Sequence, residues 1–207
     1  MKNPGYTLLV FTAVILSALP MSSQAQGLQL TPLSTFGLNG DGSIRPGERS
    51  YLTSEGTNRF QRGLAYNPTT GHLLVVNRSP IGAETINILD GATGGDLGAL
   101  DLSSLTLGGN PSFVINLIGV AEDGAIYVGN LSSANSPPEY RLYRWANEAA
   151  PQTLVFFGDP SNGDPNTSNR RWGDTLAMHG AGTGTQVLIA SRGTLVAILR
   201  PTDGTLV

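Results

Sequence analysis

Short apolar runs alternate with polar turn residues along most of the chain, and paired runs recur at a fixed interval. The pairs contain Leu64-Ala65, Val120-Ala121 and Leu176-Ala177, so both intervals are 56 residues. The runs are rich in β-branched and aromatic residues and are bounded by Gly, Pro, Asn or Asp, which is the pattern of strands and turns. No apolar stripe at helical spacing stands out after residue 25. The pattern predicts an all-β protein.

Each repeat unit continues beyond its first pair of runs. A third run covers residues 86–90, 140–145 and 195–199, and a fourth covers residues 97–102 and 153–157 in two of the units. Four strands in about 56 residues is the pattern of a β-propeller blade, which is a four-stranded sheet. A β-sandwich is the alternative, because many short strands also build two packed sheets. The fixed period favours a partial β-propeller.

The units do not add up to a closed ring, because a propeller needs about four to eight blades. The third unit ends after its third run. A copy of the fourth run stands alone over residues 28–36, where Thr31 to Gly37 resembles Thr153 to Gly158. We therefore expect the chain to be truncated at its C-terminus, and residues 28–36 to be the strand that completes the last blade.

Residues 1–25 have the organisation of a secretory signal peptide. Lys2 gives a positive start, an apolar run extends from Leu8 to Leu19, and Ser23-Gln24-Ala25 offers small residues for cleavage. The run is shorter than the roughly 20 residues that span a membrane. We expect residues 26–207 to be a propeller-like β domain without a transmembrane helix, located in the extracellular space or the periplasm.

Composition excludes several classes of protein. The formal net charge of −3 argues against a basic nucleic-acid binder, and the absence of Cys excludes a disulfide scaffold. The 27 glycines follow no three-residue period, which excludes collagen. A hydrophobic fraction of 40% with only 13% charged residues excludes disorder throughout.

The repeat phrases are similar to those of known propellers. Arg62 to Pro68, Leu73 to Arg78 and Ile88 to Gly94 resemble extracellular bacterial propellers of the NHL and YVTN type. They resemble still more closely an uncharacterised propeller-like domain family of secreted bacterial proteins. The resemblance covers residues 28–207 and implies a secreted propeller, but it carries over no catalytic residue.

One loop matches part of an EF-hand calcium motif. Its candidate ligands are Asn39, Asp41, Ser43 and Glu48. Position 1 of the motif is Gly37, where an Asp is usual, and the residues on either side of the loop do not have a helical pattern. Asn-Gly and Gly-Asp are also common turn sequences, so a plain turn is the alternative interpretation. Calcium is the only cofactor that the sequence suggests.

Arginine and aromatic residues gather where blades begin and where second strands end. In a propeller these loops share one face, so they form a candidate ligand-binding surface. Its residues are Arg59, Arg62, Arg78, Arg170, Arg171, Trp172 and Arg192. Guanidinium groups beside aromatic rings suit carboxylates, phosphates or acidic sugars. The alternative is that Arg59 and Arg170 form ion pairs with carboxylates such as Asp174.

No motif for a catalytic nucleophile, a phosphate-binding loop or a zinc site is visible. His72 and His179 lie in turns between first and second strands and are interpreted as exposed turn residues. The sequence therefore favours a binding or scaffold module for an extracellular glycan or polymer. A propeller enzyme, such as a lactonase-like hydrolase or a polysaccharide lyase completed by further blades, is the alternative, and a structural spacer is a third hypothesis.

Overall fold

The computed structural model describes residues 29–52, 60–78, 84–105, 112–133, 139–161, 170–193 and 195–201. The chain divides into two compact units, Met1–Thr31 and Pro32–Val207, and the second contains all the described strands. The described elements are β1 (Gln61–Asn67), β2 (His72–Asn77), β3 (Thr85–Asp90), β4 (Asp96–Ala99), β5 (Phe113–Val120), β6 (Ile126–Leu131), β7 (Tyr140–Trp145), β8 (Gln152–Gly158), β9 (Trp172–His179), the short 3-10 helix η2 (Gly182–Gly184), β10 (Gln186–Ser191) and β11 (Val196–Leu199).

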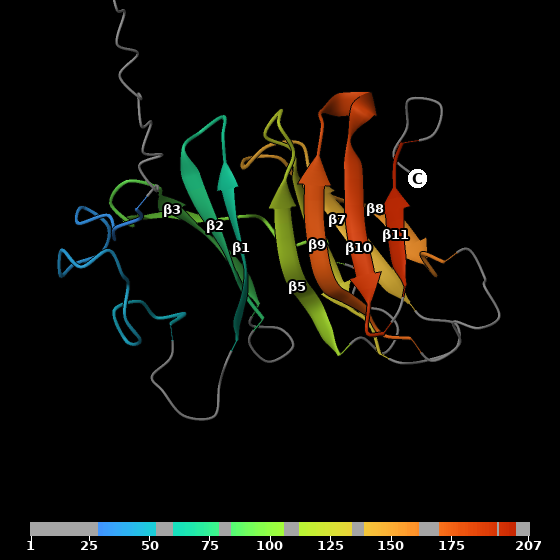
Figure 1. Cartoon of the computed structure of the whole chain (residues 1–207), viewed down its shortest axis with the longest axis horizontal. Coiled ribbons are helices and arrows are strands. Elements are labelled where there is room, and N and C mark those ends of the chain that lie inside the picture. Colours follow the sequence, from blue (N-terminus) through green and yellow to red (C-terminus); the bar gives the residue numbers. More distant parts are fainter. Residues whose placement is uncertain are drawn as a thin grey trace, which may run out of the picture. The chain divides into compact units, whose positions relative to one another are not determined.

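The strands form three antiparallel sheets in which each strand pairs with its neighbour in sequence. The orders are β1-β2-β3-β4, β5-β6-β7-β8 and β9-β10-β11. The first strands β1, β5 and β9 lie side by side (Figure 1), and both neighbouring pairs are in contact. This arrangement is a partial β-propeller, which confirms the predicted fold.

The middle sheet carries a hydrophobic core on each of its faces, which distinguishes this stack from a two-sheet sandwich. Alternate side chains of a strand point to opposite faces. Ile126 and Val128 of β6 therefore pack in the core shared with the first sheet, and Tyr127 packs in the core shared with the third. Because both faces are covered, all six residues of β6 are buried.

Glycines allow the first strands of neighbouring sheets to approach closely. A Cβ atom on Gly63 would lie 2.9 Å from the backbone nitrogen of Ile118. A Cβ atom on Gly119 would lie 2.4 Å from Cγ of Met178. Larger residues at these two positions of the repeat would push β1 from β5, and β5 from β9.

The expected strand over residues 28–36 is wrong for the part that the structure describes, residues 29–36. The Phe36 N–H donates to the Leu33 carbonyl across a turn (2.9 Å), and Gly37 has a positive φ of 84°. The Gly37 N–H then donates to the Thr93 carbonyl in the β3–β4 turn (2.9 Å). Residues 29–36 therefore form no strand, and the segment binds to a turn of the first sheet.

Residues 32–52 continue along the first sheet as an irregular segment. Arg49 Nε lies 3.1 Å from Asp96 Oδ2, and the Tyr51 hydroxyl donates to Asp96 Oδ1 (2.6 Å). Phe36 and Ile44 line a small apolar cavity of about 180 Å³ against the face of this sheet. The segment therefore covers the face of the first sheet over β2 and β3. Across the described residues, no helix is long and apolar enough to cross a membrane.

Candidate functional site

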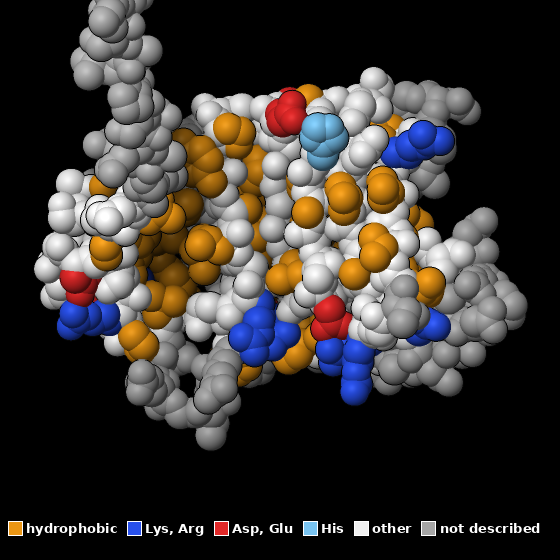
Figure 2. Space-filling model, in the orientation of Figure 1, with side chains coloured by type: hydrophobic (Ala, Val, Ile, Leu, Met, Phe, Trp, Pro, Cys, Tyr) orange, Lys and Arg blue, Asp and Glu red, His pale blue; other side chains and the backbone are white. Residues whose placement is uncertain are grey.

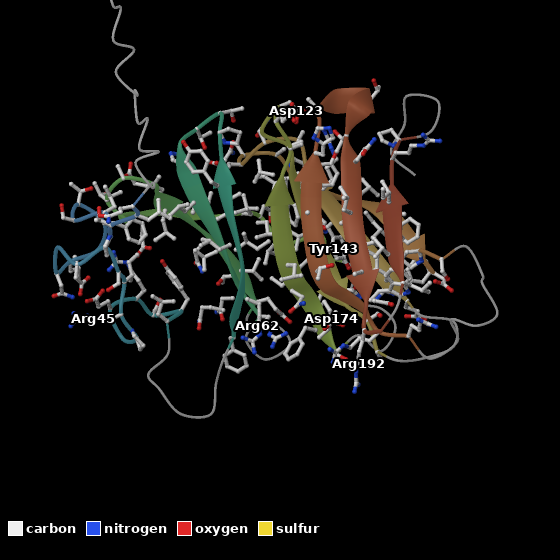
Figure 3. The ribbon with its side chains drawn as sticks, in the orientation of Figure 1. Arg45, Arg62, Asp123, Tyr143, Asp174 and Arg192 are labelled. Atoms are coloured by element: carbon white, nitrogen blue, oxygen red, sulfur yellow. The ribbon has the colours of Figure 1, made fainter. Side chains whose placement is uncertain are left out.

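Three of the predicted arginines line one pocket at the edge of the sheets. Arg62 lies on β1, Arg78 follows β2 and Arg171 precedes β9. The pocket has a volume of about 380 Å³, and its other lining residues are Phe113, Asn116, Leu117, Leu131 and Asp174. All three sheets thus contribute to the site. Figure 3 labels Arg62, Asp174 and Arg192 along this edge, with Asp123 at the opposite edge.

The side chain of Arg78 is fixed by residues of the middle sheet. Its Nη1 donates to Oδ1 of Asn116 (2.6 Å), and its guanidinium carbon lies 3.8 Å from the centroid of the Phe113 ring. The Nε atom is buried and has no hydrogen-bond partner among the described residues. Hydrogen bonding and cation–π contact hold the group in place.

Asn116 links two sheets below the pocket. It is almost fully buried on β5, and its Nδ2 donates to the Gly173 carbonyl on β9 (2.7 Å) while its Oδ1 accepts from Arg78. An amide is suited to this position because it donates and accepts at once. Sequence reasoning missed Asn116, although a polar residue inside the apolar run from Phe113 to Val120 was a visible signal.

Positive charge in the pocket exceeds the negative charge that the described residues supply. Burial lowers the pKa of the Arg78 guanidinium, and the charges of Arg62 and Arg171 lower it further. Asp174 is the one acidic residue among those that line the pocket. Its carboxylate pairs with Arg171 through two contacts, Nη2–Oδ1 at 2.5 Å and Nε–Oδ2 at 3.1 Å. Three guanidinium groups against one carboxylate leave a surplus of positive charge that favours an anion.

Arg171 and Asp174, which both line the pocket, flank a glycine with an unusual backbone conformation at the start of β9. Gly173 has φ of +96°, and a Cβ atom there would lie 2.0 Å from the carbonyl oxygen of Asn130. The Trp172 N–H donates to Ser132 Oγ (2.8 Å), which joins the third sheet to the end of β6. Glycine is required here because any side chain would collide with β6.

The other described residues of the predicted surface do not line the pocket. Trp172 is fully buried in the core between the second and third sheets, so its ring does not belong to the exposed surface. Arg192 is exposed at the same edge, and its backbone N–H donates to the Arg171 carbonyl (2.8 Å). Arg170 is half-buried, and Asp174 pairs with Arg171. Arg59 lies outside the described residues.

In the predicted calcium loop, the candidate ligands bind one another and a neighbouring arginine. Asn39 Nδ2 donates to Glu48 Oε1 (2.6 Å), and Asp41 Oδ1 accepts from Ser43 Oγ (2.7 Å). Arg45 pairs with the other oxygen of Asp41, and its backbone N–H donates to Glu48 Oε2 (2.9 Å). The hydrogen bonds of Ser43 and then of Arg45 lower the pKa of Asp41. Among the described residues, no three acidic or histidine side chains form a metal-binding group.

Both histidines lie at the edge opposite the pocket, in contacts between neighbouring sheets. His72 Nδ1 lies 2.7 Å from Glu148 Oε2, and Asn67 and Thr70 donate to Glu148 Oε1 (both 2.7 Å). Burial alone would raise the pKa of Glu148, but the hydrogen bonds from Thr70, His72 and Asn67 together lower it. His72 is therefore a half-buried contact residue, and the interpretation as an exposed turn residue is wrong for it.

The corresponding contact between the second and third sheets is more exposed. Glu122 Oε1 lies 3.6 Å from His179 Nδ1 and accepts from the Gly180 N–H (3.2 Å). Both side chains are largely exposed, as expected for His179 from its position in a turn.

No protein-family model and no curated protein matches the sequence. Similar solved structures include a DUF4623 family protein from Bacteroides eggerthii DSM 20697, at 19% identity and a TM-score of 0.47, over 72% of this chain and 37% of that chain. They also include the PQQ-bound form of an aldose sugar dehydrogenase from Streptomyces coelicolor, at 18% identity and a TM-score of 0.38, over 74% of this chain and 51% of that chain. Both have β-propeller-type folds. This chain spans between a third and about half of the length of these two proteins.

Proposed function

We propose that the chain belongs to a secreted β-propeller module that binds a carboxylate-bearing polysaccharide through the pocket of Arg62, Arg78 and Arg171. The observation that carries the proposal is the surplus of positive charge, since three guanidinium groups share the pocket with one carboxylate. A signal peptide over residues 1–25 would deliver the module to the compartments where such polymers occur.

The chemistry of the pocket favours carboxylates on a sugar. Guanidinium groups bind carboxylates through paired hydrogen bonds, which Arg171 already makes with Asp174. Phe113, Leu117 and Leu131 add apolar surface beside the charges. Binding sites commonly combine such surface with a few oriented polar groups, and this combination suits a sugar ring that bears an acid.

Calorimetric titration with polygalacturonate tests the proposal, with an uncharged galactan as the matched polymer. Arg62→Gln removes one charge at an exposed position, and Arg200→Gln is the control because Arg200 is exposed and does not line the pocket. A hydrogen bond to a charged group is worth about 1.5–3 kcal/mol, so we expect Arg62→Gln to weaken binding roughly ten- to hundredfold. Arg200→Gln should bind as the unmodified protein does.

Equal binding of both polymers, or an equal effect of the two substitutions, would contradict the proposal. Appearance of shortened or unsaturated products in the titrated samples would support the alternative of a polysaccharide lyase.

A further inference from the structure

A small apolar cavity lies between residues 32–52 and the first sheet, apart from the arginine-lined pocket. It has a volume of about 180 Å³ and is partly open to solvent. Figure 2 shows hydrophobic side chains gathered in a hollow beside the first sheet. Protein interiors contain few voids larger than a water molecule, so a space of this size needs an explanation.

The floor of the cavity is the face of the first sheet that points away from the middle sheet. Alternate residues of a strand point to opposite faces. On β2, Leu74 and Val76 are fully buried in the core shared with the middle sheet. Leu73 and Val75 point the other way and stay half-buried, and Leu89 of β3, the partner of Leu73, completes the floor. The segment that covers this face therefore leaves the space above the floor incompletely filled.

Polar contacts fix one wall of the cavity to the first sheet. Arg49 Nη2 donates to the Gly94 carbonyl (3.0 Å), and Arg49 Nε lies 3.1 Å from Asp96 Oδ2 at the start of β4. The Tyr51 hydroxyl donates to Asp96 Oδ1 (2.6 Å), and the side-chain amide of Gln61 on β1 donates to the Tyr51 carbonyl. These bonds hold the wall at a set distance from the sheet, so the cavity is preformed.

Phe36 and Ile44 form the other side of the cavity, over the turn between β3 and β4. A Cβ atom on Gly94 would lie 2.9 Å from Cδ1 of Ile44 and 3.1 Å from Cε2 of Phe36. The Thr35 hydroxyl donates to the Ala92 carbonyl of the same turn (2.8 Å). Both side chains therefore rest on the turn and leave the space over the floor empty.

The lining determines what the cavity can hold. The one polar side-chain group among the described lining residues is the Tyr51 hydroxyl, which is already bonded to Asp96. Burial, and then the contact with Asp96, raises the pKa of this hydroxyl, so it stays neutral. An ionic ligand would lose its hydration and find no partner in such a lining.

Size and shape favour a single ring. An apolar cavity of about 150 Å³ lined by Leu, Ile and Phe is known to stay dry and to bind benzene. The present cavity is similar in volume and in lining. The rings of Phe36 and Tyr51 add the edge and face contacts that aromatic groups prefer.

We propose that this cavity binds a small uncharged aromatic molecule, one ring in size. The ring would pack on Leu73 and Val75 and lie against the rings of Phe36 and Tyr51. The site consists of the first sheet and residues 32–52, so it is separate from the pocket to which all three sheets contribute.

The test is a titration of the exported protein with benzene, followed by NMR of its labelled Leu, Val and Ile methyl groups. We expect saturable shifts in the methyl groups of Ile44, Leu73, Val75 and Leu89, with a dissociation constant on the order of 1 mM. Methyl groups in the core between the second and third sheets should keep their positions.

Filling the cavity tests the site from both sides. Leu73→Trp adds a ring from the floor, and Leu52→Trp adds one from the covering segment, outside the paired strands. Each should weaken benzene binding roughly tenfold or more, and each new indole should fluoresce as a buried group. Leu154→Trp is the matched control, because Leu154 is an exposed leucine on β8. It should bind benzene as the unmodified protein does.

Absence of saturable shifts at every benzene concentration up to its solubility would overturn the proposal. Shifts spread evenly over the exposed apolar side chains would overturn it as well, because they would indicate non-specific association. So would equal benzene affinity in the unmodified protein and in both cavity-filling variants.

Discussion

Glu148 joins the first and second sheets, and its substitution by glutamine tests how these sheets are held together. Its carboxylate accepts hydrogen bonds from Asn67 and Thr70 and contacts His72, all from the first sheet or its β1–β2 turn. The Glu148 side chain is 13% exposed, and Asn67 is almost fully buried. Loss of the charge should weaken all three contacts, because a bond to a charged acceptor is worth about 1.5–3 kcal/mol and a neutral bond about 0.5–1.5 kcal/mol.

We expect Glu148→Gln to lower the free energy of unfolding by about 2 kcal/mol at pH 7. For a domain of this size, that loss lowers the Tm by about 4–8 °C. Urea unfolding followed by tryptophan fluorescence measures the change. Glu122→Gln is the matched control, because Glu122 makes the corresponding contact with His179 but is 66% exposed. It should cost less than about 1 kcal/mol.

The effect of Glu148→Gln should depend on pH. The pKa of Glu148 in the folded protein lies below its ordinary value of 4.5. A lowered carboxyl pKa contributes stability above the pKa of the unfolded chain, and the contribution is lost as pH falls through the folded value. The difference between the two proteins should therefore be complete at pH 7 and shrink below about pH 4.5. Equal losses in the two variants, or a difference independent of pH, would refute this role for Glu148.

Three further substitutions test other parts of the structure. Gly173→Ala should lower the free energy of unfolding by about 2–4 kcal/mol, because the added Cβ atom collides with a β6 carbonyl. Gly47→Ala is the control, because Gly47 also has a positive φ but has open space around it. It should lower the free energy of unfolding by less in the same urea experiment. Arg49→Ala removes the ion pair with Asp96 and should speed hydrogen exchange in residues 32–52, while exchange in the strands stays slow. Equal exchange rates in the variant and the unmodified protein would argue that the Arg49–Asp96 pair does not hold this segment. Asn116→Asp places a carboxylate against the arginine that follows β2 and should weaken polygalacturonate binding about tenfold by calorimetry, whereas unchanged affinity would show that net charge does not control binding.

The repeat was the part of the fold that the sequence could reveal, because alternation and turn residues are local signals. The pairs at Leu64-Ala65 and Leu176-Ala177 fall on β1 and β9, and Val120-Ala121 falls at the end of β5, which ends at Val120. The sheets follow in the predicted order. Residues 29–36 do not form the strand that the sequence predicts. A strand must pair with the edge of a sheet, and composition does not show whether such an edge lies close enough.

The candidate site was predictable only in part, for a similar reason. The propeller topology implied that Arg62, Arg78 and Arg171 share an edge, and the pocket brings them together. The Trp172 side chain packs in the core between the second and third sheets, which the spacing of residues in the sequence did not show. Pairs such as His72 with Glu148 join turns of different sheets, 76 residues apart, so no local pattern reveals them.

A crystal structure with a bound oligogalacturonate is the most direct test of the claim that the three arginines form an acidic-ligand site. We predict a ligand carboxylate within hydrogen-bond distance of the guanidinium groups of Arg62 and Arg78, with Phe113 still against Arg78. A ligand bound at another surface, with this pocket unchanged, would contradict the account.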